Sequence, residues 1–441
     1  MGGIVERLVP ARLGTGFRWL LASSWTSNLG DGIAVAAGPL LVASLTGNAF
    51  LVSLAALLRW APPLVFGLYA GVLSDRLDRR RIVMAADAVR AAILVVVVAL
   101  LAADRLTVVP ALVALGLLTT AEVFADNAAA TLTPTLVRRD DLVVANARLQ
   151  AGFLTLNQLV GPPVGAALFA AGLLWPFLAE AVLVAAGVLL VSRVVLPVRE
   201  PPGTRRPAGV RHEVVEGLRW TVRHPAVRTL SLTILIFNVT FGAAWSVLVL
   251  YAQQRLGLDA VGFGLFTTAG ALGGLLGTAI YGRLTSRVSL GNVMRAGLII
   301  ETLTHLALAV TTSVWIAGAV MFVFGAHAFI WGTTSITVRQ RAVPEHLQGR
   351  VGSVNTISVF GGLVVGSAIG GALATRVGVT APFWFAFAGS AVFVALLWRE
   401  LTRIAHADDA ADAPGRQPGV QAPPGGGEGS GEGPGRETMP G

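Results

Sequence analysis

Lysine and cysteine are both absent from the 441 residues of this chain. Without cysteine, the chain can form no disulfide and no thiolate metal site. Without lysine, it cannot contain the phosphate-binding motif G-x-x-x-x-G-K-[ST], which excludes an ATP-driven pump within the same chain. The hydrolase motifs H-E-x-x-H and G-x-S-x-G are also absent. The sequence therefore predicts no enzyme, no nucleotide-binding site and no bound metal or cofactor.

Charged residues are scarce as well. They make up only 13% of the chain, against 54% hydrophobic residues, and the mean hydropathy is +0.71. Soluble domains of this length do not combine such values. The net charge of +9 comes from arginines that cluster in short segments between apolar runs. That arrangement is typical of membrane topology signals and not of the contiguous basic face that nucleic acid requires.

The apolar runs have the length of transmembrane helices. A helix needs about 20 apolar residues to cross a hydrocarbon core of about 30 Å. Twelve stretches meet this standard, and the N-terminus lacks the features of a cleaved signal peptide, so the first run is expected to remain as a span. The predicted spans are 18–42, 49–73, 82–102, 107–130, 143–171, 174–195, 229–252, 260–282, 292–311, 314–338, 351–374 and 379–398.

Arginine is distributed unevenly between alternate loops, which predicts the orientation. The arginine-poor loops hold only Arg105, Arg255 and Arg376. The arginine-rich side includes both termini and the segment from Arg193 to Arg228, so we expect these regions to be cytoplasmic and the protein to lie in the inner (plasma) membrane.

The chain divides into five predicted segments. These are a cytoplasmic N-terminus (1–17), an N-terminal six-helix half (18–195), a cytoplasmic linker (196–228), a C-terminal six-helix half (229–400) and a disordered cytoplasmic tail (401–441). Within the linker, Val210, Val214, Leu218 and Val222 recur at helical spacing. This pattern predicts a basic amphipathic helix on the inner membrane surface, although a simple tether is equally compatible.

An internal repeat relates the two predicted halves. GPPVGAAL, which begins at Gly161, matches GSAIGGAL, which begins at Gly366, and the same shift of 205 residues aligns RDDL at Arg139 with PEHL at Pro344. Parallel repeats of this kind build a large class of transporters, with the substrate path between the repeats. The predicted fold is therefore all-α and integral to the membrane, with twelve transmembrane helices in two six-helix halves.

The turn between the second and third spans carries a recognisable motif. It reads GVLSDRLDRRR and resembles the G-x-L-a-D-R-x-G-R-R motif of the major facilitator superfamily. Asp78 replaces the last Gly of that pattern, and this variant is similar to the branch that contains macrolide-efflux proteins and enterobactin-type siderophore exporters. The stretches NLGDGI (from Asn28), DAVRA (from Asp87) and VPEHLQGRVGSVN (from Val343) resemble the same branch. The motif residues are Gly71, Leu73, Asp75, Arg76, Arg79 and Arg80.

The resemblance implies that this turn is a cytoplasmic gate. Asp75 is expected to engage the start of the eleventh helix, near Arg350, and to hold the halves together when the carrier faces outward. A helix N-terminus at that place would favour an anion. Gly71 would permit close approach of a neighbouring helix. The corresponding turn in the second half has Gly282 where Asp75 would fall, so only one copy is expected to form this latch.

A second resemblance concerns the fifth helix. Gly161, Pro162 and Gly165 partly match an antiporter motif that ends in G-P-x-x-G-G, which favours export over uptake. The match is incomplete, because Ala166 replaces the last Gly and Asn157 replaces an earlier one. The plainer interpretation is close helix packing through a small-xxx-small pair, and both interpretations stay open.

Ionisable side chains inside spans are costly and need a partner, a wet cavity or a function. In the superfamily, the first, fourth, seventh and tenth helices line the cavity, and the fourth helix of this chain lacks the arginine that many proton-coupled exporters carry there. Each acid could instead be a hydrogen-bonded structural residue, and the aromatic residues could serve packing alone. The candidates for proton coupling are Asp31, Glu122, Asp126 and His327, and the candidates for substrate contact are Asn28, Asn238, Trp245 and Trp331.

The remaining span charges have structural interpretations. Glu180, and Glu301 with His305, are expected to form bundle-facing pairs or packing bonds. Arg59 and Arg90 are expected to pair with carboxylates such as Asp87 or to extend to an interface.

The sequence thus predicts a secondary active transporter, expected to be a proton-coupled exporter of an amphipathic small molecule such as an antibiotic or a siderophore. Its partners would be this substrate, protons and the lipid bilayer. Three alternatives remain: an uptake carrier, a lipid translocator, or a non-transporting membrane receptor or scaffold of the same fold.

Overall fold

The architecture is helical throughout the part of the chain that the computed structural model describes, residues 11–196 and 210–400. Ten helical stretches in these ranges are long and apolar enough to cross a membrane. Two further apolar helices, α8 (Trp175–Val191) and α16 (Ala381–Leu397), have 17 residues each. No β-strand occurs in the described ranges. The predicted all-α membrane fold is therefore confirmed.

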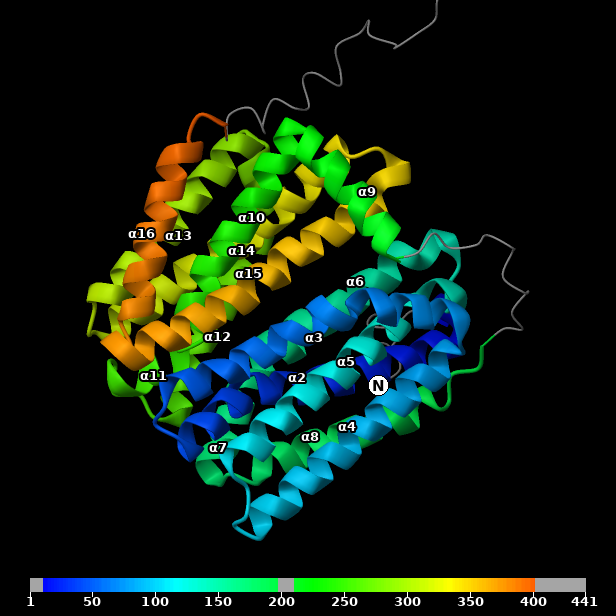
Figure 1. The fold of residues 1–441 in the computed structure, drawn as a ribbon. Helices are drawn as coiled ribbons and strands as arrows, with labels where there is room; N and C mark the ends of the chain where they lie inside the picture. The colour runs from blue at the N-terminus through cyan, green and yellow to red at the C-terminus, as the bar shows by residue number, and fades with distance from the viewer. Residues whose placement is uncertain (1–10, 197–209, 401–441) are drawn as a thin grey trace, which may run out of the picture.

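Helices α2 to α8 form an N-terminal bundle and helices α10 to α16 a C-terminal bundle (Figure 1). The N-terminal bundle consists of α2 (Gly14–Leu45), α3 (Ala49–Arg76), α4 (Arg79–Ala102), α5 (Val108–Leu136), α6 (Leu142–Gly152), a π-helical segment (Phe153–Val160), α7 (Gly161–Ala171) and α8. Helix α9 (Val210–Arg223) precedes the C-terminal bundle, which consists of α10 (Pro225–Trp245), α11 (Leu248–Gln254), α12 (Ala260–Thr285), α13 (Leu290–Val310), α14 (Val314–Ala342), α15 (Gln348–Val377) and α16.

Side-chain caps begin several of these helices after very short connections. Asn48 accepts hydrogen bonds from the backbone N–H groups of Phe50 and Leu51 at the start of α3. Asp78 does the same for Arg80 and Arg81 at the start of α4, at 3.0 and 3.3 Å. A capping carboxylate satisfies backbone donors that have no partner within the helix. The residue at which the turn motif departs from its general pattern is therefore the N-cap of α4.

Some boundaries differ from those expected. Helix α10 begins at Pro225, inside the segment predicted as linker, because proline is well suited to the first turn of a helix and His224 caps it. The fifth predicted span is not one regular helix, since a π-helical segment interrupts it between α6 and α7. Residues 1–10 of the predicted N-terminus, 197–209 of the linker and the whole tail 401–441 lie outside the described residues.

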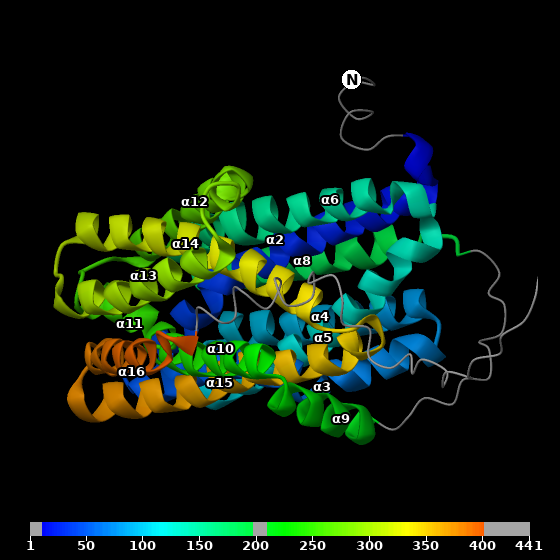
Figure 2. The same cartoon turned by 90° about the horizontal axis from the view of Figure 1, so that it is seen from above.

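The two bundles meet mainly along two helix pairs. Helix α15 packs against α3, and α12 packs against α7, so that α3 and α15 lie along one side of the molecule with α12 on the opposite side (Figure 2). One large apolar core takes side chains from both bundles, including Val52, Ala166, Phe266 and Ala374. It lies at the end that carries the α2–α3 and α15–α16 connections. The other apolar cores formed by described residues belong to one bundle each.

Glycines let helices approach backbone to backbone within each bundle. A Cβ atom added to Gly161 would collide with Gly32 of α2, and one added to Gly165 would collide with the backbone of Ile33. In the C-terminal bundle, Gly366 of α15 stands in the same relation to Val239 of α10. The positions aligned by the 205-residue shift thus make equivalent contacts, which supports the small-residue packing expected for this motif.

We predict that Gly366→Ala destabilises the folded protein, because its added methyl group would meet the carbonyl oxygen of Val239. Overpacking of this kind costs about 1–3 kcal/mol. Gly361→Ala, in the same helix, is the matched control, because a Cβ there meets nothing within 4 Å. Thermal unfolding in detergent, followed by tryptophan fluorescence, should show a lower midpoint for Gly366→Ala only. Equal midpoints for the two variants would contradict the packing described.

Candidate functional site

A cavity of about 380 Å³ lies between the two bundles. Its N-terminal wall comes from α2, α3, α4, α5, the π-helical segment, α7 and α8 and carries all of its ionisable lining residues. Its C-terminal wall comes from α10, α11, α12, α14 and α15 and is uncharged, with aromatic side chains among small and apolar ones. The ionisable lining residues are Asp31, Arg59, Arg90, Glu122 and Glu180, and the aromatic residues of the C-terminal wall include Phe241, Trp245, Phe324 and Phe329.

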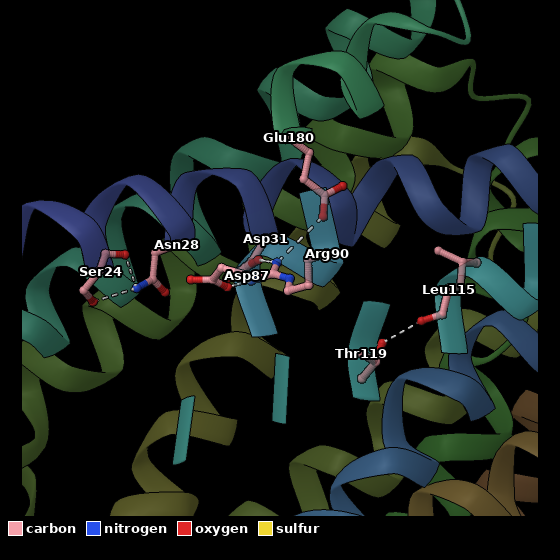
Figure 3. Close-up of polar contacts among 8 residues, drawn as sticks. All are labelled: Ser24, Asn28, Asp31, Asp87, Arg90, Leu115, Thr119 and Glu180. Carbon is pink, nitrogen blue, oxygen red and sulfur yellow. Dashed lines mark hydrogen bonds and ion pairs between the residues drawn. The ribbon is translucent and has the colours of Figure 1, made fainter. Parts of the chain in front are cut away.

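Arg90 of α4 is the centre of the charged wall (Figure 3). Its Nη2 atom forms an ion pair with Asp31 of α2 and lies 3.8 Å from Oε1 of Glu180 on α8. Its Nη1 atom lies 3.2 Å from Oδ1 of Asp87, one turn earlier on α4. Arg90, Asp87 and Glu180 are each at most 3% exposed, and Asp31 is 8% exposed. The expected Arg90–Asp87 pair is present, and the bundle-facing pairing expected for Glu180 is present too.

The packing of α2 against the π-helical segment positions Asp31. A Cβ atom on the adjacent Gly32 would lie 2.7 Å from the carbonyl oxygens of Leu156 and Asn157. This close approach fixes the position of α2 along the bundle axis, and with it the level at which Asp31 faces α4. π-Helical segments within a helix occur frequently at functional sites, and here Gln158 of the same segment lines the cavity while donating to Asn157 at 2.7 Å.

The charges in this cluster do not balance. One guanidinium group faces three carboxylates, so the cluster carries two excess negative charges when all of its groups are ionised. An unpaired charge in a buried site is strongly unfavourable, and removal of one partner from a buried ion pair costs about 3–5 kcal/mol. The arrangement therefore depends on Arg90 and is sensitive to any added proton or cation.

Glu122 of α5 faces the same cavity from the next helix. It is partly buried, and no ion pair within 4.0 Å is found for it among the described residues. Arg59 of α3 also lines the cavity, where its guanidinium lies 5.4 Å from the ring centre of Trp60. Asp126, one turn after Glu122, is exposed and lies outside the cavity lining.

Three aromatic side chains of the C-terminal wall form one cluster, in which Phe241 stacks on both Trp245 and Phe324. The Phe241 and Trp245 rings are 4.4 Å apart, Trp245 and Phe324 are 4.6 Å apart, and Phe241 and Phe324 are 5.7 Å apart. Each residue lines the cavity. Stacked rings bind flat apolar groups and also attract cations through their negative faces. The cavity thus places an acidic wall opposite an aromatic one.

His327 and Trp331 occupy a different place from the one expected. Nε2 of His327 lies 3.6 Å from Oε2 of Glu301 on α13, behind the cavity wall. Trp331 packs with His327 against Gly297 of the same helix α13. Neither residue belongs to the cavity lining. His305 is fully buried and edge-on to Trp245, with ring centres 5.9 Å apart.

Asn28 and Asn238 also lie outside the cavity lining. The amide of Asn28 donates to the carbonyl oxygen of Ser24 at 2.7 Å (Figure 3), and that of Asn238 donates to Ile234 at 2.7 Å. Both side chains therefore bond to their own helices. Trp245 is the predicted substrate-contact residue that the structure places in the cavity.

The turn motif is bonded to its own bundle. Arg79 donates to the carbonyl oxygens of Ser74 at 3.2 Å and Thr131 at 2.8 Å, and Arg80 donates to that of Ser192. Arg76 is exposed, and a Cβ on Gly71 would meet nothing within 4 Å. The close approach expected at Gly71 is therefore not made in this conformation. The side chain of Asp75 lies outside the described residues.

Sequence reasoning missed the central position of Arg90. The signal was present, since Asp87 and Arg90 are three residues apart in an apolar run, where a charged pair must face the interior. The sequence did not indicate that Asp31 and Glu180, on helices distant in the chain, share the same guanidinium. Within residues 11–196 and 210–400, no three His, Cys, Asp or Glu side chains are placed so that they could hold one metal ion.

The fold and the central cavity together define a multi-span membrane transporter. The chain superposes on a bacterial homologue of the iron transporter ferroportin in an inward-facing state with a TM-score of 0.70, at 17% identity over 88% of this chain and 99% of that one. It superposes on the nucleoside transporter NupG with a TM-score of 0.68, at 12% identity over 89% and 99% of the respective chains. At such identities, the likeness concerns the fold alone.

Sequence comparison gives the family. The family model described as transmembrane secretion effector matches residues 7–423, and the chain belongs to this family of the major facilitator superfamily. It is 29% identical to the multidrug efflux pump Tap of Mycolicibacterium fortuitum over 82% of this chain and 90% of Tap. It is 26% identical to the enterobactin exporter EntS of Salmonella typhimurium over 90% of this chain and 95% of EntS. The family and these relatives are transporters and not enzymes, as the sequence predicted.

We predict that Arg90→Gln strongly destabilises the protein, because it leaves Asp31, Asp87 and Glu180 without their shared counter-charge. A loss of about 3–5 kcal/mol is expected. Arg59→Gln is the control, since Arg59 lines the same cavity without a carboxylate within ion-pair distance among the described residues. Thermal unfolding and yield of folded protein measure the effect.

The double variant Arg90→Gln with Glu180→Gln should recover part of the loss, because it removes one of the excess negative charges. If the single Arg90→Gln variant is as stable as Arg59→Gln, the cluster is not the electrostatic centre described here.

Proposed function

We propose that this chain is a proton-coupled exporter of an amphipathic small molecule, operating by alternating access. In this proposal, twelve helices in two six-helix halves span the inner membrane, with both termini cytoplasmic and α8 and α16 as the two shortest spans. The observation that carries the proposal is the carboxylate cluster around Arg90, which opens onto a cavity between the two bundles.

Proton coupling is supported by the charge count of the cavity wall. Three carboxylates (Asp31, Glu122 and Glu180) and two guanidinium groups (Arg59 and Arg90) line the cavity. Asp87, outside the lining, adds a fourth carboxylate through its pair with Arg90. Because the carboxylates around Arg90 are buried, such an excess of negative charge favours the binding of either a proton or a cationic substrate. Two ligands that compete for the same carboxylates are the basis of exchange: a proton bound from outside releases the substrate, and the substrate bound from inside displaces the proton.

Alternating access is supported by the asymmetric packing between the bundles. The apolar core to which both bundles contribute lies at the end with few loop arginines, which we assign to the outside. At the opposite end, the apolar cores are separate. This arrangement fits a carrier whose cavity is open to the cytoplasm. The open space at Gly71 would then be filled when the cytoplasmic end closes.

The substrate class follows from the two walls of the cavity. The names of the relatives point to drugs for Tap and to the siderophore enterobactin for EntS. An acidic wall repels an anionic siderophore, whereas a positively charged amine can lie near Glu122 while its flat apolar part packs on Trp245. We therefore propose an organic cation with an aromatic or polycyclic body as the substrate.

Export is tested by energy-dependent accumulation in cells that express the chain. We expect lower accumulation of ethidium than in cells without it, and the difference should vanish when a protonophore is added. Asp31→Asn and Glu122→Gln should each abolish most of this difference, because each removes a carboxylate from the acidic wall. Gly361→Ala, which alters neither wall, is the control variant.

Two results would contradict this assignment. If both carboxylate variants keep wild-type export driven by the proton gradient, neither acid is a coupling site. If the chain lowers accumulation of a catecholate siderophore but not of ethidium, the proposed substrate charge is wrong although export stands.

The cytoplasmic turn motif gives a separate prediction. Asp75→Asn should leave membrane insertion unchanged, because the four arginines that set the topology of this turn are retained. It should slow transport strongly, because we propose that Asp75 engages the start of α15 in the outward-facing state. If a well-expressed variant transports at the wild-type rate, the motif serves only as a topology signal.

A further inference from the structure

One face of helix α9 is fixed to the start of α15. Glu216 accepts a hydrogen bond from Nη1 of Arg350 at 2.6 Å, and a Cβ on Gly217 would collide with the backbone of the same arginine. Trp220 packs against the buried group formed by Val227, Val343, Leu347 and Val351. Helix α9 is therefore packed against the C-terminal bundle and is not a loose tether.

The opposite face of α9 is apolar, yet it is exposed. Val215, Leu218 and Val222 are 36%, 50% and 52% exposed, and their spacing of three and four residues places them along one stripe. Arg219 and Arg223 are exposed beside this stripe. An apolar stripe flanked by arginines is the pattern of a helix that lies in the interface of an anionic membrane.

The chain itself holds α9 at the edge of the membrane. Only His224 separates the end of α9 at Arg223 from the start of α10 at Pro225, and the α10 stretch is apolar enough to span the bilayer. Helix α9 crosses the end of α15 instead of continuing along it (Figure 1). This short connection keeps α9 beside the end of a membrane span.

We propose that the stripe formed by Val215, Leu218 and Val222, with Arg219 and Arg223, docks on the headgroup layer of an anionic lipid bilayer. The apolar side chains enter the boundary between headgroups and acyl chains, and the guanidinium groups bind lipid phosphates. Because Glu216 and Gly217 contact Arg350, docking holds the cytoplasmic end of α15. Helix α15 also packs against α3 of the other bundle, so α15 must move when the two bundles rearrange. Through the docking of α9, the charge of the lipid headgroups therefore acts on α15.

The absence of cysteine makes a direct test simple. Leu218→Cys supplies a single thiol for an environment-sensitive fluorophore in the full-length protein. In nanodiscs of phosphatidylcholine with phosphatidylglycerol, we expect blue-shifted emission that is quenched by brominated acyl chains. Ser286→Cys, in the exposed turn between α12 and α13, is the matched control and should give water-like, unquenched emission.

The charge dependence is tested in the same labelled protein. Adding Arg219→Gln and Arg223→Gln should lower the docking equilibrium constant by about 30-fold in anionic discs. Adding Arg287→Gln, which removes an exposed arginine elsewhere on the same side, should change it little. The proposal is overturned if position 218 stays unquenched in anionic discs, or if its quenching is the same with and without the two arginines.

The effect on transport rests on the proposed function and is measured separately, as the ratio of ethidium transport in anionic to that in neutral proteoliposomes. This ratio should exceed one for the wild type and fall toward one for the double arginine variant. A lipid-dependent fluorescence signal in a protein that transports no ethidium would leave docking intact and contradict only the proposed substrate. A ratio that is unchanged by the double variant would overturn the link between docking and α15.

Discussion

The structure depends on a single guanidinium group held among carboxylates inside a membrane span. Arg90 joins α2, α4 and α8 through Asp31, Asp87 and Glu180, and all four side chains are buried. A charge in such a place needs a counter-charge or a water-filled cavity, because the alternative is an uncompensated ion in an apolar medium. Three carboxylates surround this one guanidinium group. The cluster that holds the three helices together therefore carries excess negative charge at the cavity.

Backbone packing makes this electrostatic arrangement possible. The glycines of α7 bring α2 so near that the main chains touch, and Asp31 stands next to that contact. The equivalent glycines of α15 pack α10 in the C-terminal bundle, where the wall of the cavity is aromatic instead of acidic. The two bundles thus share a packing scheme and differ in chemistry. A carrier built in this way can offer a substrate an anionic surface and an apolar one at the same time.

Much of the fold could be predicted from the sequence, because hydropathy, loop arginines and glycine spacing are local properties of the chain. The acids Asp31 and Glu122 were also identifiable as candidates, because a carboxylate in an apolar run is costly and indicates a partner, a water-filled cavity or a function. Which helix faces turn toward each other is not a local property. For that reason, the sequence did not reveal that Glu180 reaches Arg90 or that His327 turns away from the cavity toward Glu301. The cap formed by Asp78 could have been inferred, because an Asp directly before a helix is a standard start signal.

We propose that one acidic wall binds protons and an organic cation in exchange. It is tested most directly in proteoliposomes with an acidic interior and an internal pH indicator, by adding ethidium outside. We expect that ethidium enters, that the interior becomes more alkaline in proportion, and that both effects are lost in Asp31→Asn. Ethidium entry without any change of internal pH, or exchange that survives in Asp31→Asn, would contradict it.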